Sequence, residues 1–269
     1  MGSLVFRIAG SAAASYSNVY SIDFERDDGD YLIASSTSAL DITDGGTAFS
    51  ISLWVKPEAS QQGPLFSKGT DQIFARLSSL NKVTFVLGGG ATVNAAPALT
   101  LDTDTAISNG SWSHYVFTYD GSGATSGFKA YLNGSDDTQI VTEYSSFTSS
   151  TSITNSTAFQ IGKAPTHWLL ASGADAYNQK TFDGKIDEFS FWDKTLSSSE
   201  VTAIYNSGTP DNLADHSAYD DLTSWYRMGD HASDDLTADS GQVTDAKGSN
   251  HLTPKNTASA NKVEDVTGS

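Results

Sequence analysis

Residues 182–200 constrain the fold more than any other part of this chain of 269 residues. Residues 182–192 are interpreted as an extended strand, in which successive side chains point to opposite faces. A tight bend follows at residues 193–196. Ser197 and Glu200 then match a capping box, which begins a short helix. This order of strand, bend and capped helix predicts the architecture but no ligand.

Strict alternation places residues at defined faces of the predicted strands. In the strand above, Asp187 shares a face with two phenylalanines, and Glu188 lies on the opposite face. Residues 49–57 alternate most cleanly, with Trp54 opposite the apolar face that carries Phe49, Ile51, Leu53 and Val55. A hairpin with an Asp-Gly turn is predicted at 20–33. Further strands are predicted at 64–69, 74–77, 83–87, 112–119, 128–134, 159–162 and 222–229. The short helix after Ser197 is the only one expected, and Gly208 stands where its C-terminal cap belongs.

Composition agrees with many strands joined by many turns. Charged residues make up 17% of the chain and hydrophobic residues 38%, below the usual ~45–50%. A chain of this length can form one large all-β domain, and no internal repeat divides it. We expect residues 1–19 to be an arm or peripheral strand, 20–256 the β domain, and 257–269 a flexible tail.

Charge and residue usage exclude several classes of partner. The net charge of −17 repels phosphates, so we expect no nucleic-acid partner. The chain has no cysteine, which excludes disulfides and thiolate metal sites. No apolar run reaches the ~18 residues of a membrane span, and Arg7 interrupts the first apolar stretch. We therefore expect neither a membrane segment nor a signal peptide.

Six pieces of the chain, in order, resemble the LamG-like domains, the laminin-G/pentraxin-type, concanavalin A-like jelly rolls. They lie at 22–32, 49–57, 112–121, 129–134, 159–162 and 184–205. The resemblance implies an all-β, two-sheet antiparallel sandwich with one short helix, a concave face and a loop rim. It also implies binding of glycans or proteins, in some members through Ca²⁺, and some members decorate phage particles or tail fibres.

Enzymatic motifs are missing from the sequence. Related jelly-roll hydrolases carry Glu-x-Asp-x-x-Glu on one strand, and none of the six glutamates fits that pattern. There is no Gly-x-Ser-x-Gly and no His-x-x-x-His. We expect a protein that is not an enzyme.

Calcium is the metal that the residues favour, because Ca²⁺ takes six to eight oxygen ligands. The candidates are Asp28, Asp30 and Asp187. A carboxylate on the face of Phe189 and Phe191 must be bound to a metal, ion-paired or hydrogen-bonded to backbone N–H groups, and these interpretations of Asp187 stay open. The stretch at 162–167, where pentraxin-type members carry ligands, has no carboxylate.

Aromatic side chains are the candidates for stacking on sugars or contacting a partner. Trp54 and Trp192 lie opposite the apolar faces of their strands and are expected to line the concave sheet. Tyr131 joins them, and Trp168 falls in a loop at the rim. The alternative interpretation is that these large rings fill a core.

Two main hypotheses about function follow, and a hydrolase is kept as a third only because sandwich folds host such enzymes. The first is a non-enzymatic structural protein of a bacteriophage virion, a capsid decoration or tail-associated component that contacts other virion subunits through sheet edges and the segments 1–19 and 230–269. Residues 225–230 also resemble an extension of phage-borne members. The second is a carbohydrate-binding lectin or adhesin module, Ca²⁺-dependent or not, that binds cell-surface glycan. Both place an assembled or oligomeric protein on a virion or an extracellular surface.

Overall fold

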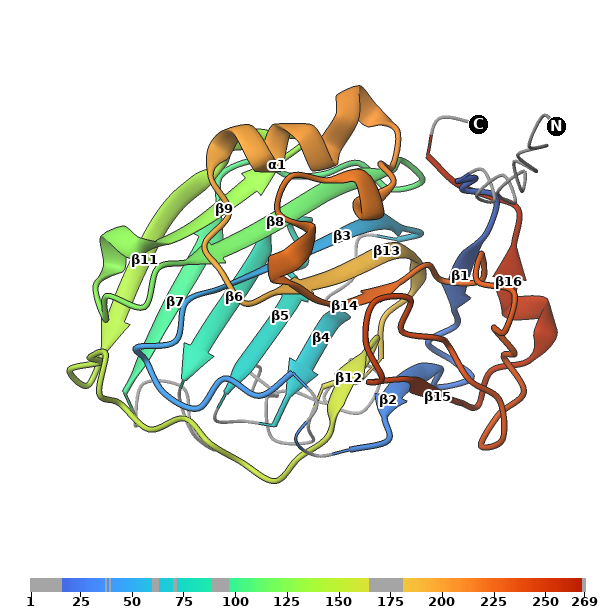
Figure 1. Cartoon of the computed structure of the whole chain (residues 1–269), viewed down its shortest axis with the longest axis horizontal. Helices are drawn as coiled ribbons and strands as arrows, with labels where there is room; N and C mark the ends of the chain where they lie inside the picture. Colours follow the sequence, from blue (N-terminus) through green and yellow to red (C-terminus); the bar gives the residue numbers. More distant parts are fainter. Residues whose placement is uncertain are drawn as a thin grey trace, which may run out of the picture.

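Two antiparallel sheets lie face to face and form the body of the protein (Figure 1). The computed structural model describes residues 16–36, 38, 40–59, 63–69, 72–88, 97–164 and 181–267. Strand pairs are antiparallel in both sheets, and one short α-helix packs outside them. The expected all-β, concanavalin A-like sandwich with one short helix is confirmed for these residues.

The first sheet, sheet A, has the order β10-β9-β8-β3-β13-β1-β16, with β14 pairing beside β13. Its strands are β1 (Ser21–Phe24), β3 (Phe49–Pro57), β8 (Ser113–Tyr119), β9 (Phe128–Leu132), β10 (Ser135–Asp136), β13 (Gly184–Trp192), β14 (Leu222–Tyr226) and β16 (Lys262–Val263). Strands β3 and β13, which have the clearest sequence signals, pair with each other in the middle of this order.

The second sheet, sheet B, has the order β11-β7-β6-β5-β4-β12-β2-β15. Its strands are β2 (Tyr31–Ala34), β4 (Gly63–Lys68), β5 (Ile73–Leu77), β6 (Val83–Gly88), β7 (Ala98–Thr103), β11 (Thr138–Tyr144), β12 (Phe159–Ile161) and β15 (Leu252–Lys255). Short 3-10 turns occur at Thr125–Gly127, Asn206–Gly208, Leu213–Asp215, Tyr219–Asp221 and Ser259–Asn261.

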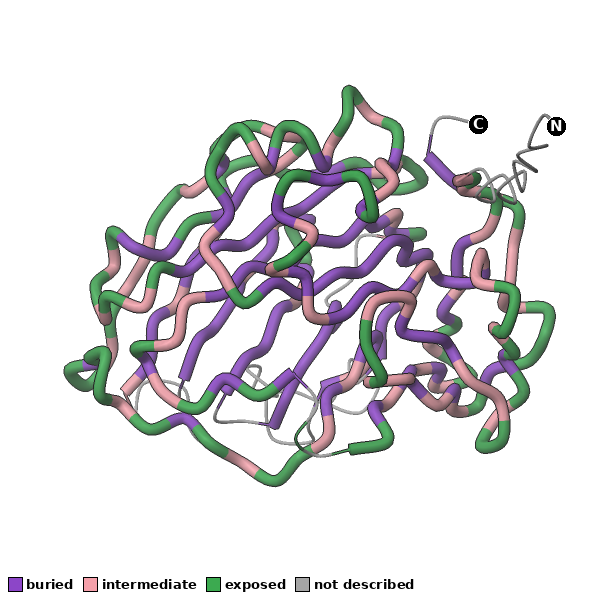
Figure 2. Tube along the Cα trace, viewed as in Figure 1, coloured by how far each residue is buried: buried purple, intermediate pink, exposed green. Residues whose placement is uncertain are grey.

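The main core fills the space between the sheets. The apolar face of β3 lies in it, as its alternation predicts, together with side chains from β8. Phenylalanines from the two sheets meet there edge to face: the ring centroids of Phe85 and Phe117 are 4.8 Å apart. Each such ring contributes about 1.5–3 kcal/mol by leaving water. The strands form the buried interior, and the connections lie outside (Figure 2).

A second core covers the outer face of sheet A. Helix α1 (Ser198–Tyr205) and the turns that follow it pack on this face (Figure 1). Its residues are Val116, Tyr131, Trp192, Leu196, Val201, Ile204, Leu213, Ala218, Leu222 and Trp225. This face of the sheet is therefore an internal layer and not an open concave surface.

Helix α1 begins as its sequence predicts. The Ser197 hydroxyl accepts the Glu200 N–H, and the Glu200 carboxylate accepts the Ser197 N–H in return. Two of the four unpaired N–H groups of the first turn are thereby satisfied. The C-terminal cap differs from the prediction, since Asn206 takes the left-handed conformation at φ 45° two residues before Gly208.

The C-terminal segment differs from the predicted flexible tail. Strand β16 pairs with β1, and the Asp265 carboxylate accepts both Lys56 Nζ (2.8 Å) and the Trp112 indole N–H (3.3 Å). Thr267 also donates to the Gly208 carbonyl oxygen. Residues up to 267 are thus part of the sandwich, because partners distant in sequence hold a segment that has little apolar patterning of its own.

No helix in the described part of the chain is both long and apolar enough to cross a membrane.

Candidate functional site

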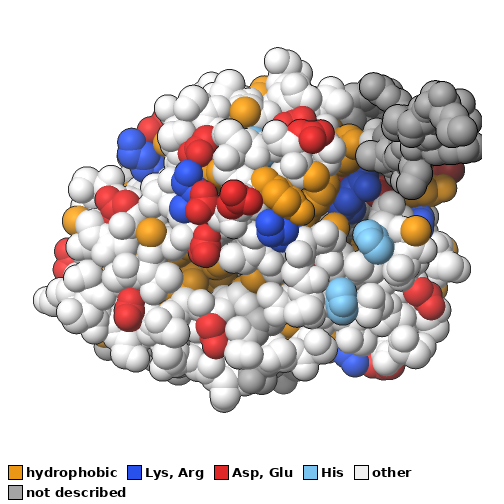
Figure 3. Space-filling model, viewed as in Figure 1, with side chains coloured by type: hydrophobic (Ala, Val, Ile, Leu, Met, Phe, Trp, Pro, Cys, Tyr) orange, Lys and Arg blue, Asp and Glu red, His pale blue; other side chains and the backbone are white. Residues whose placement is uncertain are grey.

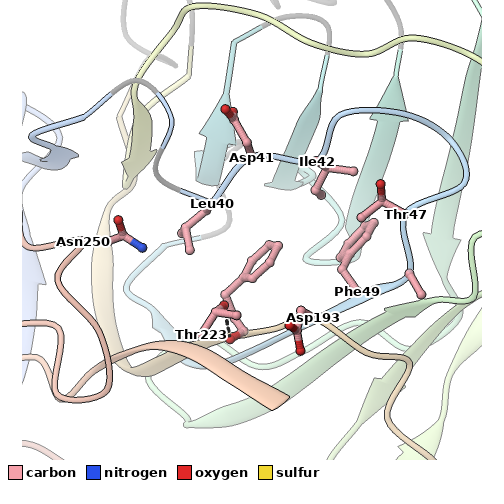
Figure 4. Close-up of a pocket in the computed structure, with 10 residues that line it drawn as sticks. Leu40, Asp41, Ile42, Thr47, Phe49, Asp193, Thr223 and Asn250 are labelled. Carbon is pink, nitrogen blue, oxygen red and sulfur yellow. Dashed lines mark hydrogen bonds between the residues drawn. The ribbon is translucent and has the colours of Figure 1, made fainter. Parts of the chain in front are cut away.

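A pocket of about 210 Å³ opens at one end of the sandwich (Figure 4). Residues 40–48, which connect β2 to β3, form one wall, and the ends of β13 and β14 form the other. Apolar side chains make its base and polar ones its border: Leu40, Ile42, Ala48, Phe49 and Phe191, with Asp41, Thr47, Asp193, Thr223 and Asn250. At ~30 Å³ per water molecule, the space equals about seven waters, which suits one small ligand.

The 40–48 loop is built by local hydrogen bonds and one close approach. Asp44 Oδ1 accepts the Gly46 N–H (2.9 Å) and the Thr47 hydroxyl (3.0 Å), an Asx-type turn. A Cβ on Gly45 would lie 2.2 Å from the Thr148 carbonyl oxygen, so only glycine fits there. The Tyr119 hydroxyl donates to the Gly45 carbonyl from the core. The loop is therefore fixed to the sandwich before any ligand binds.

A buried lysine holds the acidic border of the pocket. Lys68 on β4 has a fully buried side chain, and its Nζ lies 2.9 Å from Asp41 Oδ1 and 3.1 Å from the Thr157 carbonyl oxygen. A buried ammonium is costly without such partners. The Asp41 side chain keeps a third of its surface exposed, so the pair links the inside of sheet B to the pocket border.

The face that carries this pocket bears scattered acidic side chains, with lysine or arginine side chains among them (Figure 3). Figure 3 shows acidic side chains spread over it, around a hollow in which hydrophobic side chains are visible. Asp193, directly after β13, is exposed at the pocket. An apolar base with a few polar groups around it is the usual form of a small-ligand site.

A second group of polar residues lies on the outer face of sheet A, where β13 contains a bulge. The register against β3 shifts between Asp187 and Ser190, and Glu188 has φ 47°. Because of the extra residue, Asp187 and Glu188 both lie outside the core between the sheets, while Phe189 stays in it. This corrects the expectation that the two acids face opposite sides and that Asp187 shares the face of the phenylalanines.

Both acids are buried and are fully engaged by hydrogen bonds. Asp187 accepts the Asn18 side-chain amide (2.9 Å) and the Glu188 N–H (2.8 Å). Glu188 accepts the Tyr16 hydroxyl (3.1 Å) and the Trp225 indole N–H. Arg227 lies 3.5 Å from Glu188, and its guanidinium also sits over the Tyr16 ring. The two acids therefore hold residues 16–18 against β13 and β14 through hydrogen bonds to Tyr16 and Asn18.

Burial changes the proton affinity of this pair. Burial raises the pKa of Glu188 to about 7, against the opposing effect of Arg227. Burial, and then the adjacent Glu188 charge, raise the pKa of Asp187 well above its ordinary value. Side chains with 0% and 5% of their surface exposed cannot reach a substrate, so the pair has a structural role in this conformation.

The sequence of the folded domain matches a known family. A family model described as the concanavalin A-like lectin/glucanases superfamily matches residues 26–202. The chain belongs to this superfamily. The LamG-like resemblance of the strand motifs is thereby confirmed.

Individual relatives share parts of this superfamily domain. Mouse pentraxin-related protein PTX3 is 30% identical over 161 residues, which cover 58% of this chain and 38% of that protein. A crystal structure of a candidate carbohydrate-binding protein from Bacteroides ovatus has a TM-score of 0.60 at 13% identity, over 89% of this chain and 58% of that one. A heptameric SAP-like pentraxin from Limulus polyphemus has a TM-score of 0.48 at 15% identity, over 70% and 82%.

The likeness to the Bacteroides structure concerns the fold alone. The chain spans less than two thirds of the length of the mouse and Bacteroides proteins. At 13–15% identity the solved structures carry no residue-level correspondence to the pocket.

The predicted aromatic platform of this concanavalin A-like domain is covered. Trp54, Trp192 and Tyr131 do lie on the face opposite the main core, but they are 3%, 0% and 6% exposed. Trp54 stacks on Tyr205 of α1, and Trp192 contacts His216 edge to face. A ring packed under a helix cannot stack on a sugar, so the alternative of aromatic packing describes these three. Trp168 lies outside the described residues.

The calcium candidates are not brought together. Asp28 is exposed in the hairpin turn, whereas Asp30 is buried and accepts the Glu25 N–H (3.1 Å) and the Asn261 amide (2.7 Å). Asp187 bonds to Asn18 and a backbone N–H, which is the hydrogen-bonded interpretation of this residue. Within the described ranges, no three His, Asp or Glu side chains converge as a metal site.

The pocket residues escaped the sequence analysis. Residues 44–46 read Asp-Gly-Gly, a turn signal that predicts a loop but not what the loop faces. Asp193 falls in the predicted bend, and Asn250 is more than 50 residues further along the chain. These residues form one site only because the fold places three segments, far apart in the sequence, next to one another.

Proposed function

We propose that this protein is a non-enzymatic binding module that holds one sugar unit in the pocket between the 40–48 loop and the ends of β13 and β14. The observation that carries the proposal is the pocket itself, an apolar base of about 210 Å³ bordered by side-chain oxygens. A pyranose ring has apolar C–H faces and hydroxyl edges, so it matches a site of this composition.

The chemistry of the border favours binding over bond cleavage. Glycosidic cleavage needs two accessible carboxyl groups at a set separation, ~5–5.5 Å for retention. The adjacent acids of β13 are enclosed by Tyr16, Trp225 and Arg227. In the pocket, Asp41 is tied to Lys68. A reducing-sugar assay on oligosaccharides with the purified protein checks this, and a steady release of new ends would reject the non-enzymatic assignment.

Sugar binding is tested by titrating the ¹⁵N-labelled protein with monosaccharides, with and without EDTA, which also shows whether Ca²⁺ takes part. We expect saturable shifts confined to residues that line the pocket. Ala48→Phe fills the pocket and is expected to abolish them. Ala124→Phe, at an exposed position in another loop, is the matched control. Binding that survives Ala48→Phe, or no binding to any sugar tested, contradicts the proposal.

We infer a second, compatible role as a structural protein of a bacteriophage virion, either a capsid decoration or a tail-associated component. Its supports are the resemblance of residues 225–230 to an extension of phage-borne members and the added strands β14, β15 and β16, which follow the matched domain. Its partners would be other virion subunits, with the pocket free for a cell-surface glycan. Mass spectrometry of purified particles tests this role, and particles without the chain would reject it.

A further inference from the structure

We propose that the pocket selects a sugar that carries a protonated amine over neutral and acidic sugars. This proposal rests on the proposed sugar binding and names the class of ligand for that same site. It follows from which hydrogen-bonding groups of the border remain available, and from the charge that is left unpaired there.

The hydroxyl hydrogens at the pocket border are already used. The Thr47 hydroxyl donates to Asp44 Oδ1 (3.0 Å), and the Thr223 hydroxyl donates to the Phe191 carbonyl oxygen (2.9 Å), the bond drawn dashed in Figure 4. The Asn250 side-chain amide donates one N–H to the Ser224 hydroxyl oxygen (3.2 Å). A ligand therefore meets oxygen acceptors on most of the border, and an ammonium group offers three donors to them.

The two carboxylates of the border differ in how they are compensated. Asp41 is paired with the buried Lys68, and in Figure 4 its carboxylate is directed away from the apolar side chains. Asp193 is exposed, on the strand side of the pocket (Figure 4). Asp193 forms no ion pair with any residue that the structure describes, and neighbouring Lys194 is paired with Glu200 (2.9 Å) and Asp221 (3.6 Å). One negative charge is thus left for a ligand.

The wider surface acts in the same direction. The chain carries a net charge of −17, and acidic side chains, with some lysine or arginine side chains among them, lie around the hollow in Figure 3. A carboxylate or phosphate ligand would be repelled by this negative charge and would have few hydrogen-bond donors to accept from. Both the repulsion and the lack of donors disfavour an anionic ligand. A neutral hexose can donate its hydroxyls to the same acceptors, but it gains no ion pair with Asp193.

The expected preference is modest because the pocket mouth is open to water. An exposed ion pair improves affinity by about two- to fivefold at low salt, and added salt weakens it. Glucosamine and galactosamine should therefore bind about two- to fivefold more tightly than glucose and galactose at about pH 6, where a primary amine is protonated. Glucuronate and galacturonate should bind more weakly than the neutral sugars.

The test is a titration of the ¹⁵N-labelled full chain with these six sugars, in wild type and Asp193→Asn. The variant keeps the side-chain shape and removes the charge, so it should bind the amino sugars no better than the neutral ones. Asp27→Asn lies at an exposed turn outside the pocket and removes one negative charge, as Asp193→Asn does. This control variant should keep the preference for amino sugars. Circular dichroism confirms that each variant is folded.

The outcomes separate this proposal from the one on which it rests. Equal affinity for amino and neutral sugars, or a preference that survives Asp193→Asn, overturns the amine selection and leaves sugar binding intact. A preference lost equally in Asp27→Asn also overturns it, because the long-range charge would then be sufficient. Binding of none of the six sugars overturns both.

Discussion

The buried acids of β13 give this protein a stability that falls as the pH rises. The unfolded chain releases the Glu188 proton near its ordinary pKa of 4.5, whereas the folded chain holds it up to about pH 7. Between these values the unfolded state binds fewer protons, so the free energy of unfolding decreases with pH. At 1.36 kcal/mol per pH unit, the pKa displacement of Glu188 corresponds to a loss on the order of 3 kcal/mol between pH 4.5 and 7.

Glu188→Gln isolates this effect. Glutamine has the shape of the protonated acid and cannot ionise, so the variant should be about as stable as the wild type near pH 4.5. Near pH 7.5 it should gain, relative to the wild type, on the order of 3 kcal/mol, less any cost of depriving Arg227 of its partner. Urea unfolding at a series of pH values measures the difference, with an unchanged m-value as the check that both chains unfold alike.

A second buried group makes the difference more informative than the wild-type curve alone. Burial lowers the pKa of His114 to about 3 from 6.5, so stability also falls as the pH drops below 6.5. The two trends oppose each other in the wild type. The contribution of His114 is present in both chains and cancels when the Glu188→Gln stability is subtracted from that of the wild type, which leaves the contribution of Glu188. Glu143→Gln, exposed on β11, should show no such change. A wild-type to Glu188→Gln difference that stays constant from pH 4.5 to 7.5 would refute the reasoning.

Three further outcomes follow from the structure. His114→Gln should flatten the acid limb of the stability curve below pH 6.5, measured by urea unfolding; an unaltered acid limb would show that His114 is not its source. Lys68→Met should lower the free energy of unfolding by about 1–3 kcal/mol, because the hydrogen bond to the Thr157 carbonyl is lost. It should also weaken sugar binding, because Asp41 loses its ion-pair partner. An unchanged sugar affinity would show that the Lys68–Asp41 pair does not contribute to the pocket. Asp265→Asn should cost about 1 kcal/mol or less and speed amide exchange in β16, and unchanged exchange would argue against this anchor.

Local patterns in the sequence predicted those parts of the fold that depend on local forces. The alternation of β3 placed the right residues in the core, because the period of a strand is a property of its backbone. The capping box of α1 was predicted for the same reason, since both partners lie within one turn. The alternation of β13 failed at Glu188, because a bulge depends on pairing with neighbouring strands.

The candidate site could not be predicted in the same way. The outward orientation of Trp54 and Trp192 was predicted, but not that α1 and the turns after it would cover them. The pocket is lined by Asp41, Asp193 and Asn250 from three separate segments of the chain. No pattern in the sequence predicts that these segments lie close together.

The sequence by itself determined the strands and the single capped helix, since periodicity and capping act over a few residues, and its resemblance to LamG-like domains implied that the strands form two packed sheets. The tertiary structure alone decided which sheet face is covered, that the C-terminal segment completes the sheet, and where a ligand fits. Those features depend on burial and charge pairing between residues far apart in the chain, and such contacts exist only after the sheets have packed.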